Sequence, residues 1–204
     1  MKTFITIIFF LTLHYLSNAQ VDTLLTADRK IYHKIKGLKA RNIDTVICYY
    51  ESSSNDIPPP PVLKDSCYTY QEKYLIWHQD GQYYMERFSE CPDNPQITDS
   101  GPYKLLRKNF PQILKERIRP PESIKVVNGK KIRIGSAGSD YPVYIIKIYV
   151  SGKIIEKDID WYDLNTKYIF GKDLNRNYLS NQKSALNKLK MLIEKEVQAH
   201  YKGK

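Results

Sequence analysis

The sequence predicts an α+β fold of two layers, in which a mainly antiparallel sheet built from hairpins packs against N-terminal and C-terminal amphipathic helices. Three residue pairs, Asp80-Gly81, Asn128-Gly129 and Ser151-Gly152, each separate two strand-like runs. Two-residue hairpin turns need positive φ at both positions, which such pairs tolerate. Near both ends of the chain, apolar residues instead recur at helical spacing. Hairpins between terminal helices favour the α+β class.

Residues 1–19 have the pattern of a secretory signal peptide. A short positive start precedes an almost unbroken apolar run over residues 3–16, and Ser17-Asn18-Ala19 follows. A signal peptidase accepts this arrangement, and the run is shorter than the roughly 20 apolar residues of a membrane span. We therefore expect cleavage after Ala19, which leaves one α+β domain over residues 20–204. An uncleaved N-terminal anchor is the alternative.

The net charge indicates an anionic partner. The formal charge is +10 at pH 7, of which one unit leaves with Lys2 on cleavage. Such an excess normally suggests nucleic acid, but export removes that partner. An envelope protein or an anionic envelope polymer is expected instead, and a solvated surface with no dedicated partner is the alternative. No later segment approaches membrane length, so no stable membrane insertion is expected after cleavage.

The first elements after the cleavage point are a helix and a strand. Residues 20–39 have apolar positions at helical spacing, with Gly37 as a stop. Residues 44–51 form a mostly apolar run, which favours an inner strand covered on both faces. Four prolines at 58–61 cannot continue that strand, and they indicate an extended surface loop.

Two hairpins have a predicted register. A turn at Asp80-Gly81 brings aromatic and apolar side chains together across residues 74–88, and a turn at Ser151-Gly152 brings apolar groups and opposite charges together. The predicted pairs are Gln79 with Gln82, His78 with Tyr83, Trp77 with Tyr84, Ile76 with Met85, Ile148 with Ile155, and Lys147 with Glu156.

Two helices complete the predicted fold. Residues 103–118 have helical spacing, and Pro111 should break this helix because it lacks a backbone donor, opening a second piece. Residues 180–202 form an amphipathic helix, for which Ser180 is the expected N-cap.

Three cysteines follow the cleavage point, and an oxidising compartment favours one disulfide. We expect Cys67 to pair with Cys91, provided that a bulge brings them opposite each other, with Cys48–Cys67 as the alternative. No metal site is expected, because the chain lacks the Cys-x-x-Cys and His-x-x-x-His spacings of zinc sites. A catalytic cysteine is equally unsupported, and no cofactor is expected.

Aromatic residues provide the candidate binding surface. The loop at 135–140 lacks the residues of a phosphate loop. The acidic and aromatic cluster at 158–163 suits either carbohydrate contact or packing at a strand end. Tyrosine is abundant around the hairpins, and it is favoured both at interfaces and in ordinary sheets. The candidate surface residues are Trp77, His78, Tyr83, Tyr84, Trp161 and Tyr162.

The sequence therefore favours an exported protein, periplasmic or extracellular, that binds or scaffolds something in the envelope without catalysis. Its lysine-, isoleucine-, asparagine- and tyrosine-rich composition is typical of exported proteins from AT-rich Gram-negative bacteria. One alternative is a small envelope hydrolase whose carboxylates or histidines converge only in the fold. Another is electrostatic attachment to anionic polymers through the lysine-rich helices. A pocket with several ionisable groups of perturbed pKa would favour the hydrolase.

Overall fold

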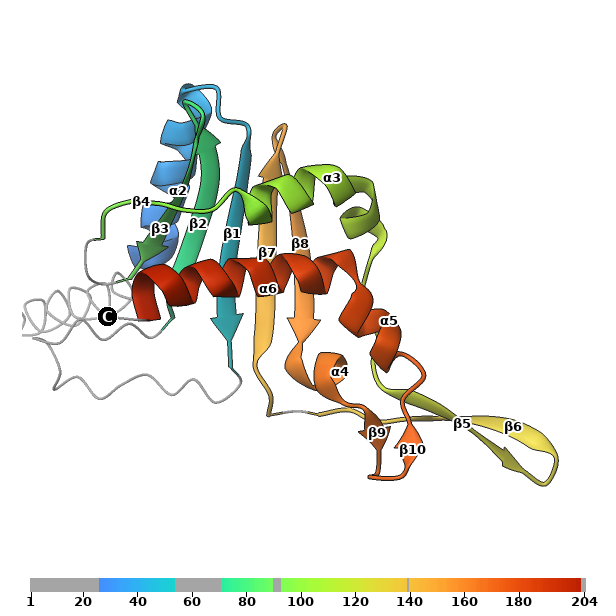
Figure 1. Cartoon of the computed structure of the whole chain (residues 1–204). Coiled ribbons are helices and arrows are strands. Elements are labelled where there is room, and N and C mark those ends of the chain that lie inside the picture. The colour runs from blue at the N-terminus through green and yellow to red at the C-terminus, as the bar shows by residue number, and fades with distance from the viewer. Residues whose placement is uncertain (1–25, 54–70, 90–92, 139, 203–204) are drawn as a thin grey trace, which may run out of the picture.

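The computed structural model describes residues 26–53, 71–89, 93–138 and 140–202 (Figure 1). The helices are α2 (Thr26–Ala40), α3 (Gly101–Lys115), α4 (Trp161–Asn165), α5 (Tyr178–Lys183) and α6 (Ala185–Val197), and α6 continues into a π-helical turn, η1 (Gln198–Lys202). The strands are β1 (Thr45–Ser52), β2 (Lys73–Gln79), β3 (Gln82–Phe88), β4 (Gln96–Ile97), β5 (Glu122–Val127), β6 (Lys130–Gly135), β7 (Val143–Val150), β8 (Lys153–Asp160), β9 (Tyr168–Ile169) and β10 (Asp173–Leu174). The predicted signal peptide and the four prolines lie outside the described residues.

The fold is α+β, as predicted, with an antiparallel sheet at its centre. Six strands lie in the order β4-β3-β2-β1-β7-β8, and every neighbouring pair is antiparallel. Two further two-stranded ribbons, β5–β6 and β9–β10, lie beyond the sheet at one end of the molecule (Figure 1). Helices begin and end the described chain.

The register of both predicted hairpins is confirmed. Ile76 lies opposite Met85 and His78 opposite Tyr83 in β2–β3. In β7–β8, Ile148 lies opposite Ile155. The opposite charges meet as expected, with Lys147 Nζ 3.0 Å from a carboxylate oxygen of Glu156. Local turn chemistry and cross-strand pairing therefore agree in this sheet.

Both faces of the sheet are covered, because successive side chains of a strand point to opposite faces. Ile47 and Tyr49 of β1 belong to a cluster with α3 and α6. Val46 and Cys48 belong to a second cluster, under α2. This explains why β1 is apolar on both faces, and α2 adds a helix on the face opposite α6 (Figure 1).

Two helix predictions have different outcomes. The α3 helix is broken as expected, because Asn109 leaves helical geometry at φ −113° two residues before Pro111. The prediction of Ser180 as a helix N-cap is wrong, since Ser180 lies inside α5. Ser184 is the N-cap of α6 instead, and its hydroxyl accepts a hydrogen bond from the Asn187 backbone N–H. Among the described residues, no helix has both the length and the apolar character needed to span a bilayer.

Candidate functional site

The six predicted surface residues lie in three separate places. Trp77 and Tyr84 stack at a centroid distance of 5.6 Å in the cluster beneath α2. Trp77 is only 2% exposed, and the ammonium group of Lys34 lies 4.7 Å from the centre of its ring. Trp77 is therefore part of the core, because β2 is an inner strand with both faces covered.

On the other face of the sheet, the rings of His78 and Tyr83 lie 4.6 Å apart with their planes tilted by 38°, and the Tyr103 ring of α3 lies 5.6 Å from that of Tyr83. Side chains that are neighbours along the strands thus face opposite sides. Trp77 and His78 cannot contribute to one surface for this reason.

Trp161 and Tyr162 lie at the far end of β8, where each stacks on Tyr141, at 5.0 and 5.2 Å. The Asp160 carboxylate caps α4 by accepting hydrogen bonds from the backbone N–H groups of Tyr162 and Asp163. Packing at a strand end thus describes this cluster. Trp161 nevertheless stays 37% exposed.

Of the three cysteines after the predicted cleavage point, the structure describes only Cys48. Cys67 and Cys91 lie outside the described residues, so their disulfide stays a prediction. Cys48 is a free, buried thiol in β1, so the alternative Cys48–Cys67 bond is absent. Burial raises the pKa of this thiol to about 12, which keeps it protonated. Within the described ranges, no three His, Cys, Asp or Glu side chains are placed to hold a metal ion.

The fold forms a groove between α3 and the α5–α6 segment that the sequence alone does not predict. Two hollows of about 760 and 480 Å³ open along these helices, and Gln112 lines both. We call them together the cationic groove. Its basic lining residues are Lys104, Lys108, Lys115, Arg117, Arg119, Lys183 and Lys188.

Amphipathic packing produces this groove. Leu106 and Ile113 of α3 are buried with Leu189 and Ile193 of α6 in the cluster beneath the sheet. Lys104, Lys108 and Lys115 consequently lie on the outer face of α3, and Lys188 on that of α6. The other three lie in α5 or in the segment after α3, and all seven are exposed. Among the described residues, none of the seven forms an ion pair.

The single carboxylate that lines the groove, Glu116, has internal partners. Its Oε2 accepts a hydrogen bond of 2.8 Å from the Leu186 backbone N–H at the start of α6, and its Oε1 accepts one from Gln112. A negative charge at this place is stabilised by the N-terminal end of the helix. Glu116 therefore contributes to the fold, and the rest of the charged lining is positive.

Buried amide contacts hold the groove wall in place. Asn181 is 2% exposed. Its Oδ1 accepts from the Arg119 backbone N–H at 3.1 Å, and its Nδ2 donates to the carbonyls of Arg119 at 2.8 Å and Asp163 at 3.1 Å. Nearby, Lys157 donates to the carbonyls of Leu114 and Glu116 at the end of α3. The pKa of Lys157 is lowered by burial and then by the neighbouring Arg117.

A second site is a small pocket of about 260 Å³ between β1, β2 and the end of α6. The Tyr49 hydroxyl donates to Glu194 Oε1 at 2.9 Å, and Lys190 Nζ donates to both oxygens of Glu194 at 2.7 Å. The Tyr74 hydroxyl donates to Glu72 in the same way.

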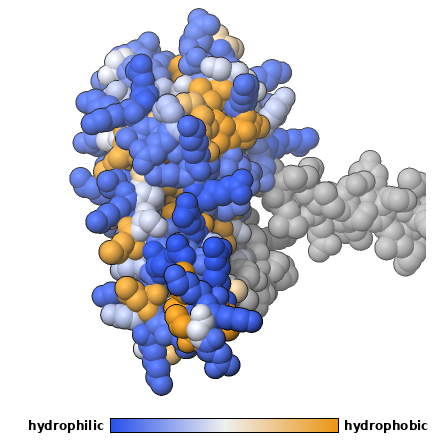
Figure 2. All heavy atoms as spheres, turned by 90° about the vertical axis from the view of Figure 1, so that its right-hand side faces the viewer, coloured by the Kyte–Doolittle hydropathy of each residue, from blue (hydrophilic) through white to orange (hydrophobic). Residues whose placement is uncertain are grey.

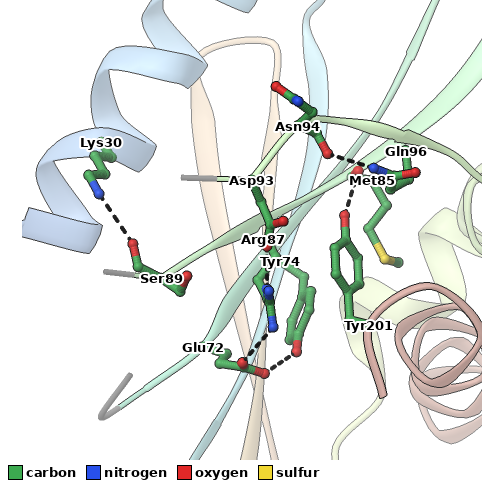
Figure 3. A network of polar contacts seen from close by, with 10 residues as sticks. All are labelled: Lys30, Glu72, Tyr74, Met85, Arg87, Ser89, Asp93, Asn94, Gln96 and Tyr201. Atoms are coloured by element: carbon green, nitrogen blue, oxygen red, sulfur yellow. Dashed lines mark hydrogen bonds and ion pairs between the residues drawn. The ribbon is translucent and has the colours of Figure 1, made fainter. Parts of the chain in front are cut away.

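Figure 3 shows how this pocket connects to β3 and the end of the chain. Arg87 reaches Glu72 at 3.1 Å and also bonds to Asp93. The guanidinium carbon of Arg87 lies 5.2 Å from the ring centre of Tyr201, whose hydroxyl donates to the Met85 carbonyl at 3.0 Å. The network attaches η1 to the sheet.

The tyrosines of this pocket stay protonated at neutral pH and act as hydrogen-bond donors. Burial, followed by the adjacent Glu194 carboxylate, raises the pKa of Tyr49 well above its usual range. Burial and the hydrogen bond to Glu72 do the same for Tyr74. Glu72 is paired with Arg87 and Glu194 with Lys190, whereas Glu51, which also lines the pocket, forms no ion pair within the described residues. The arrangement suits a structural polar network.

The cationic groove was not predicted, although the sequence of its first helix is strongly basic. Five of the six charged residues in 103–118 are basic, the exception being Glu116. What the sequence does not reveal is that α5 and α6 bring further lysines beside them. Comparison of the chain with protein-family models, with curated proteins and with solved structures found no match.

Proposed function

We propose that this protein is a non-enzymatic, exported binding module whose cationic groove holds an anionic polymer of the cell envelope. The observation that carries the proposal is the lining of the groove, where seven exposed basic side chains meet one carboxylate that is already bonded within the fold. Positive charges without internal partners attract anionic ligands and speed their capture.

The shape of the groove favours a polymer over a small ligand. A helix of the length of α3 extends over roughly 20 Å, and basic residues line its outer face from Lys104 to Lys115. The hollows are open to solvent and do not enclose a ligand as small-molecule sites do. Repeated negative charges along a chain would contact several lysines at once.

The alternative, a small envelope hydrolase, draws its support from the pocket of Tyr49 and Tyr74, which holds two groups of perturbed pKa. Both shifts are upward from the usual range for tyrosine, so neither phenol is a base near neutral pH. Two of the three pocket carboxylates, Glu194 and Glu72, are paired with Lys190 and Arg87. These features support a structural role more than an acid–base role.

Binding of dextran sulfate, with uncharged dextran as the reference, tests the proposal. We expect the full chain to bind dextran sulfate with an affinity that falls as sodium chloride is raised, because salt screens exposed charges. The triple variant Lys104→Gln, Lys108→Gln and Lys188→Gln should bind at least about tenfold more weakly at low salt and with a shallower salt dependence.

The matched control removes three exposed lysines elsewhere: Lys36→Gln, Lys39→Gln and Lys153→Gln. This variant has the same net charge as the groove variant, and we expect its affinity to change by less than about twofold. Equal losses in both triple variants would show that net charge alone attracts the polymer. Binding that persists unchanged at high salt would equally contradict the proposal.

A further inference from the structure

Polar contacts hold the ribbons β5–β6 and β9–β10 together at one end of the molecule. The two ribbons are joined by an ion pair of 2.8 Å between Lys125 and Asp173. The Glu122 backbone N–H donates to Asn175 Oδ1 at 3.1 Å, and the Arg176 backbone N–H donates to the Glu122 carbonyl at 2.9 Å. We call residues 122–135 and 166–176 the hairpin end, which projects beyond the central sheet (Figure 1).

Exposed apolar side chains concentrate at the hairpin end. Of the 15 large hydrophobic side chains that are exposed among the described residues, seven lie in these two short segments. They are Ile124, Val126, Val127, Ile132, Tyr168, Phe170 and Leu174. Figure 2, which views this side of the molecule, shows orange apolar patches between blue hydrophilic residues in its lower half. Such a concentration marks an interaction surface in a soluble protein.

Phe170 combines high exposure with backbone strain. Within the described ranges, four two-residue turns have positive φ at both positions, and three of them carry Asp80, Asn128 or Ser151 before the glycine. The fourth, between β9 and β10, carries Phe170 at φ 49° with 73% of the residue exposed. A bulky residue in this region is disfavoured, and an exposed ring gains little from packing. The fold alone gives no reason for phenylalanine here, and strain of this kind is typical of functional sites.

The charge of the hairpin end selects the chemistry of the partner. Its two segments contain seven lysines and arginines but only two carboxylates. Those carboxylates are Asp173, which pairs with Lys125, and Glu122, which pairs with Arg133 and Arg176. The excess is therefore positive, which favours an anionic surface.

The geometry of β5–β6 favours a partner that surrounds both faces of the ribbon over one that covers a single face. Alternation along the strands places Ile124 and Val126 on one face of the ribbon and Val127 and Ile132 on the other, and every one of them is exposed. Lysine or arginine lies opposite or between these residues on both faces. A protein partner covering one face would leave the other apolar face in water. The headgroup region of a membrane contacts both faces, while long basic side chains reach the phosphates.

We propose that the hairpin end docks reversibly onto a membrane surface that contains anionic lipid, with Phe170 and the valines of β5 entering the headgroup region. This surface is separate from the cationic groove, so the inference does not rest on the proposed function. Aromatic and aliphatic side chains beside lysine and arginine have this role in peripheral membrane binding. Anionic lipid adds attraction for each basic residue near the surface.

Co-sedimentation of the full chain with lipid vesicles tests this inference. We expect binding to phosphatidylcholine vesicles that contain about one third phosphatidylglycerol, and much weaker binding to phosphatidylcholine alone. The substitution Phe170→Asn introduces a residue that suits the turn. It should therefore raise Tm by about 2–4 °C while it weakens vesicle binding roughly tenfold. A merely structural role for Phe170 predicts a lower Tm instead.

A matched control and a spectroscopic probe complete the test. Ile154→Thr removes a side chain of 63% exposure on β8, and its binding should change by less than about twofold. In Phe170→Trp, the emission of the added tryptophan should shift to shorter wavelength when anionic vesicles are present. The same shift should occur when Lys104, Lys108 and Lys188 of the groove are changed to glutamine, because the two surfaces are separate.

Three results would overturn the inference. The first is unchanged vesicle binding by Phe170→Asn, which would assign the attraction to the groove. The second is the absence of a blue shift in Phe170→Trp. The third is a dimer that Phe170→Asn dissociates while vesicle binding is absent, because the partner would then be a second copy of the chain.

Discussion

Replacing Asn181 by alanine removes a buried amide from the wall of the cationic groove. The change leaves three backbone groups without their partner, namely the N–H and carbonyl of Arg119 and the carbonyl of Asp163. Leaving one buried polar group unpaired costs about 1–3 kcal/mol. Because the site borders an open hollow, water can satisfy part of this demand. We expect the free energy of unfolding to fall by about 3 kcal/mol.

Equilibrium unfolding in urea, followed by fluorescence of the buried Trp77, measures this loss. With a slope of about 2 kcal/mol per molar urea, the midpoint should fall by about 1.5 M. The matched control is Asn165→Ala, whose amide donates a single exposed hydrogen bond to the Trp161 carbonyl. That variant should lose less than about 0.5 kcal/mol. A loss below about 1 kcal/mol in Asn181→Ala, or equal losses in both variants, would refute this reasoning.

Two further predictions concern single ionisable groups. Burial and then the Asp160 carboxylate raise the pKa of Asp163 from 3.8 to about 6. The folded state therefore holds a proton that the unfolded chain releases, and the free energy of unfolding should fall as pH rises from about 4 to about 6. Asp163→Asn should flatten this slope and, after allowance for the partial exposure of the group, stabilise the protein at pH 7 by about 1 kcal/mol; an unchanged slope in urea titrations would contradict this. Cys48 should resist a thiol reagent such as Ellman's until the chain is unfolded, because its thiol is buried with a pKa of about 12. Rapid labelling of Cys48 in the folded protein, located by peptide mass spectrometry, would contradict that expectation.

The hairpins could be predicted because their determinants are local. A residue pair such as Ser151-Gly152 has positive φ at both positions, and the two-residue turn then fixes every pair along the strands. The break in α3 is local too, since Pro111 cannot donate a backbone hydrogen bond. In each case the residues that decide the structure lie within a few positions of it.

The start of α6 was missed because two serines precede the same apolar pattern. Helical spacing continues through both Ser180 and Ser184. Only the backbone distinguishes them, since Ser184 is extended, at φ −60° and ψ 148°, and ends α5 as well as capping α6. The spacing of apolar residues alone does not reveal that the helix is interrupted at Ser184, because that spacing continues across the interruption.

The candidate sites depend on distant contacts that no local pattern contains. The groove forms because α3 packs beside α6, about 80 residues later in the chain. Trp77 is buried because β2 is an inner strand with α2 above it. The turn at Phe170-Gly171 is not predictable from sequence, because phenylalanine is unusual at a position that Asn or Asp normally occupies.

The central position of β1 has a consequence for how the chain folds. β1 pairs with β2 nearby, but its other neighbour is β7, so that Tyr49 lies opposite Ile146. The hairpins β2–β3 and β7–β8 need only short loops and can close within microseconds. The β1–β7 ladder must bring together segments separated by about one hundred residues, and such distant pairing slows folding. Until β7 arrives, β1 presents an open apolar edge. If the proposed export precedes folding, this slow pairing would leave the central sheet incomplete until β7 has also crossed the membrane.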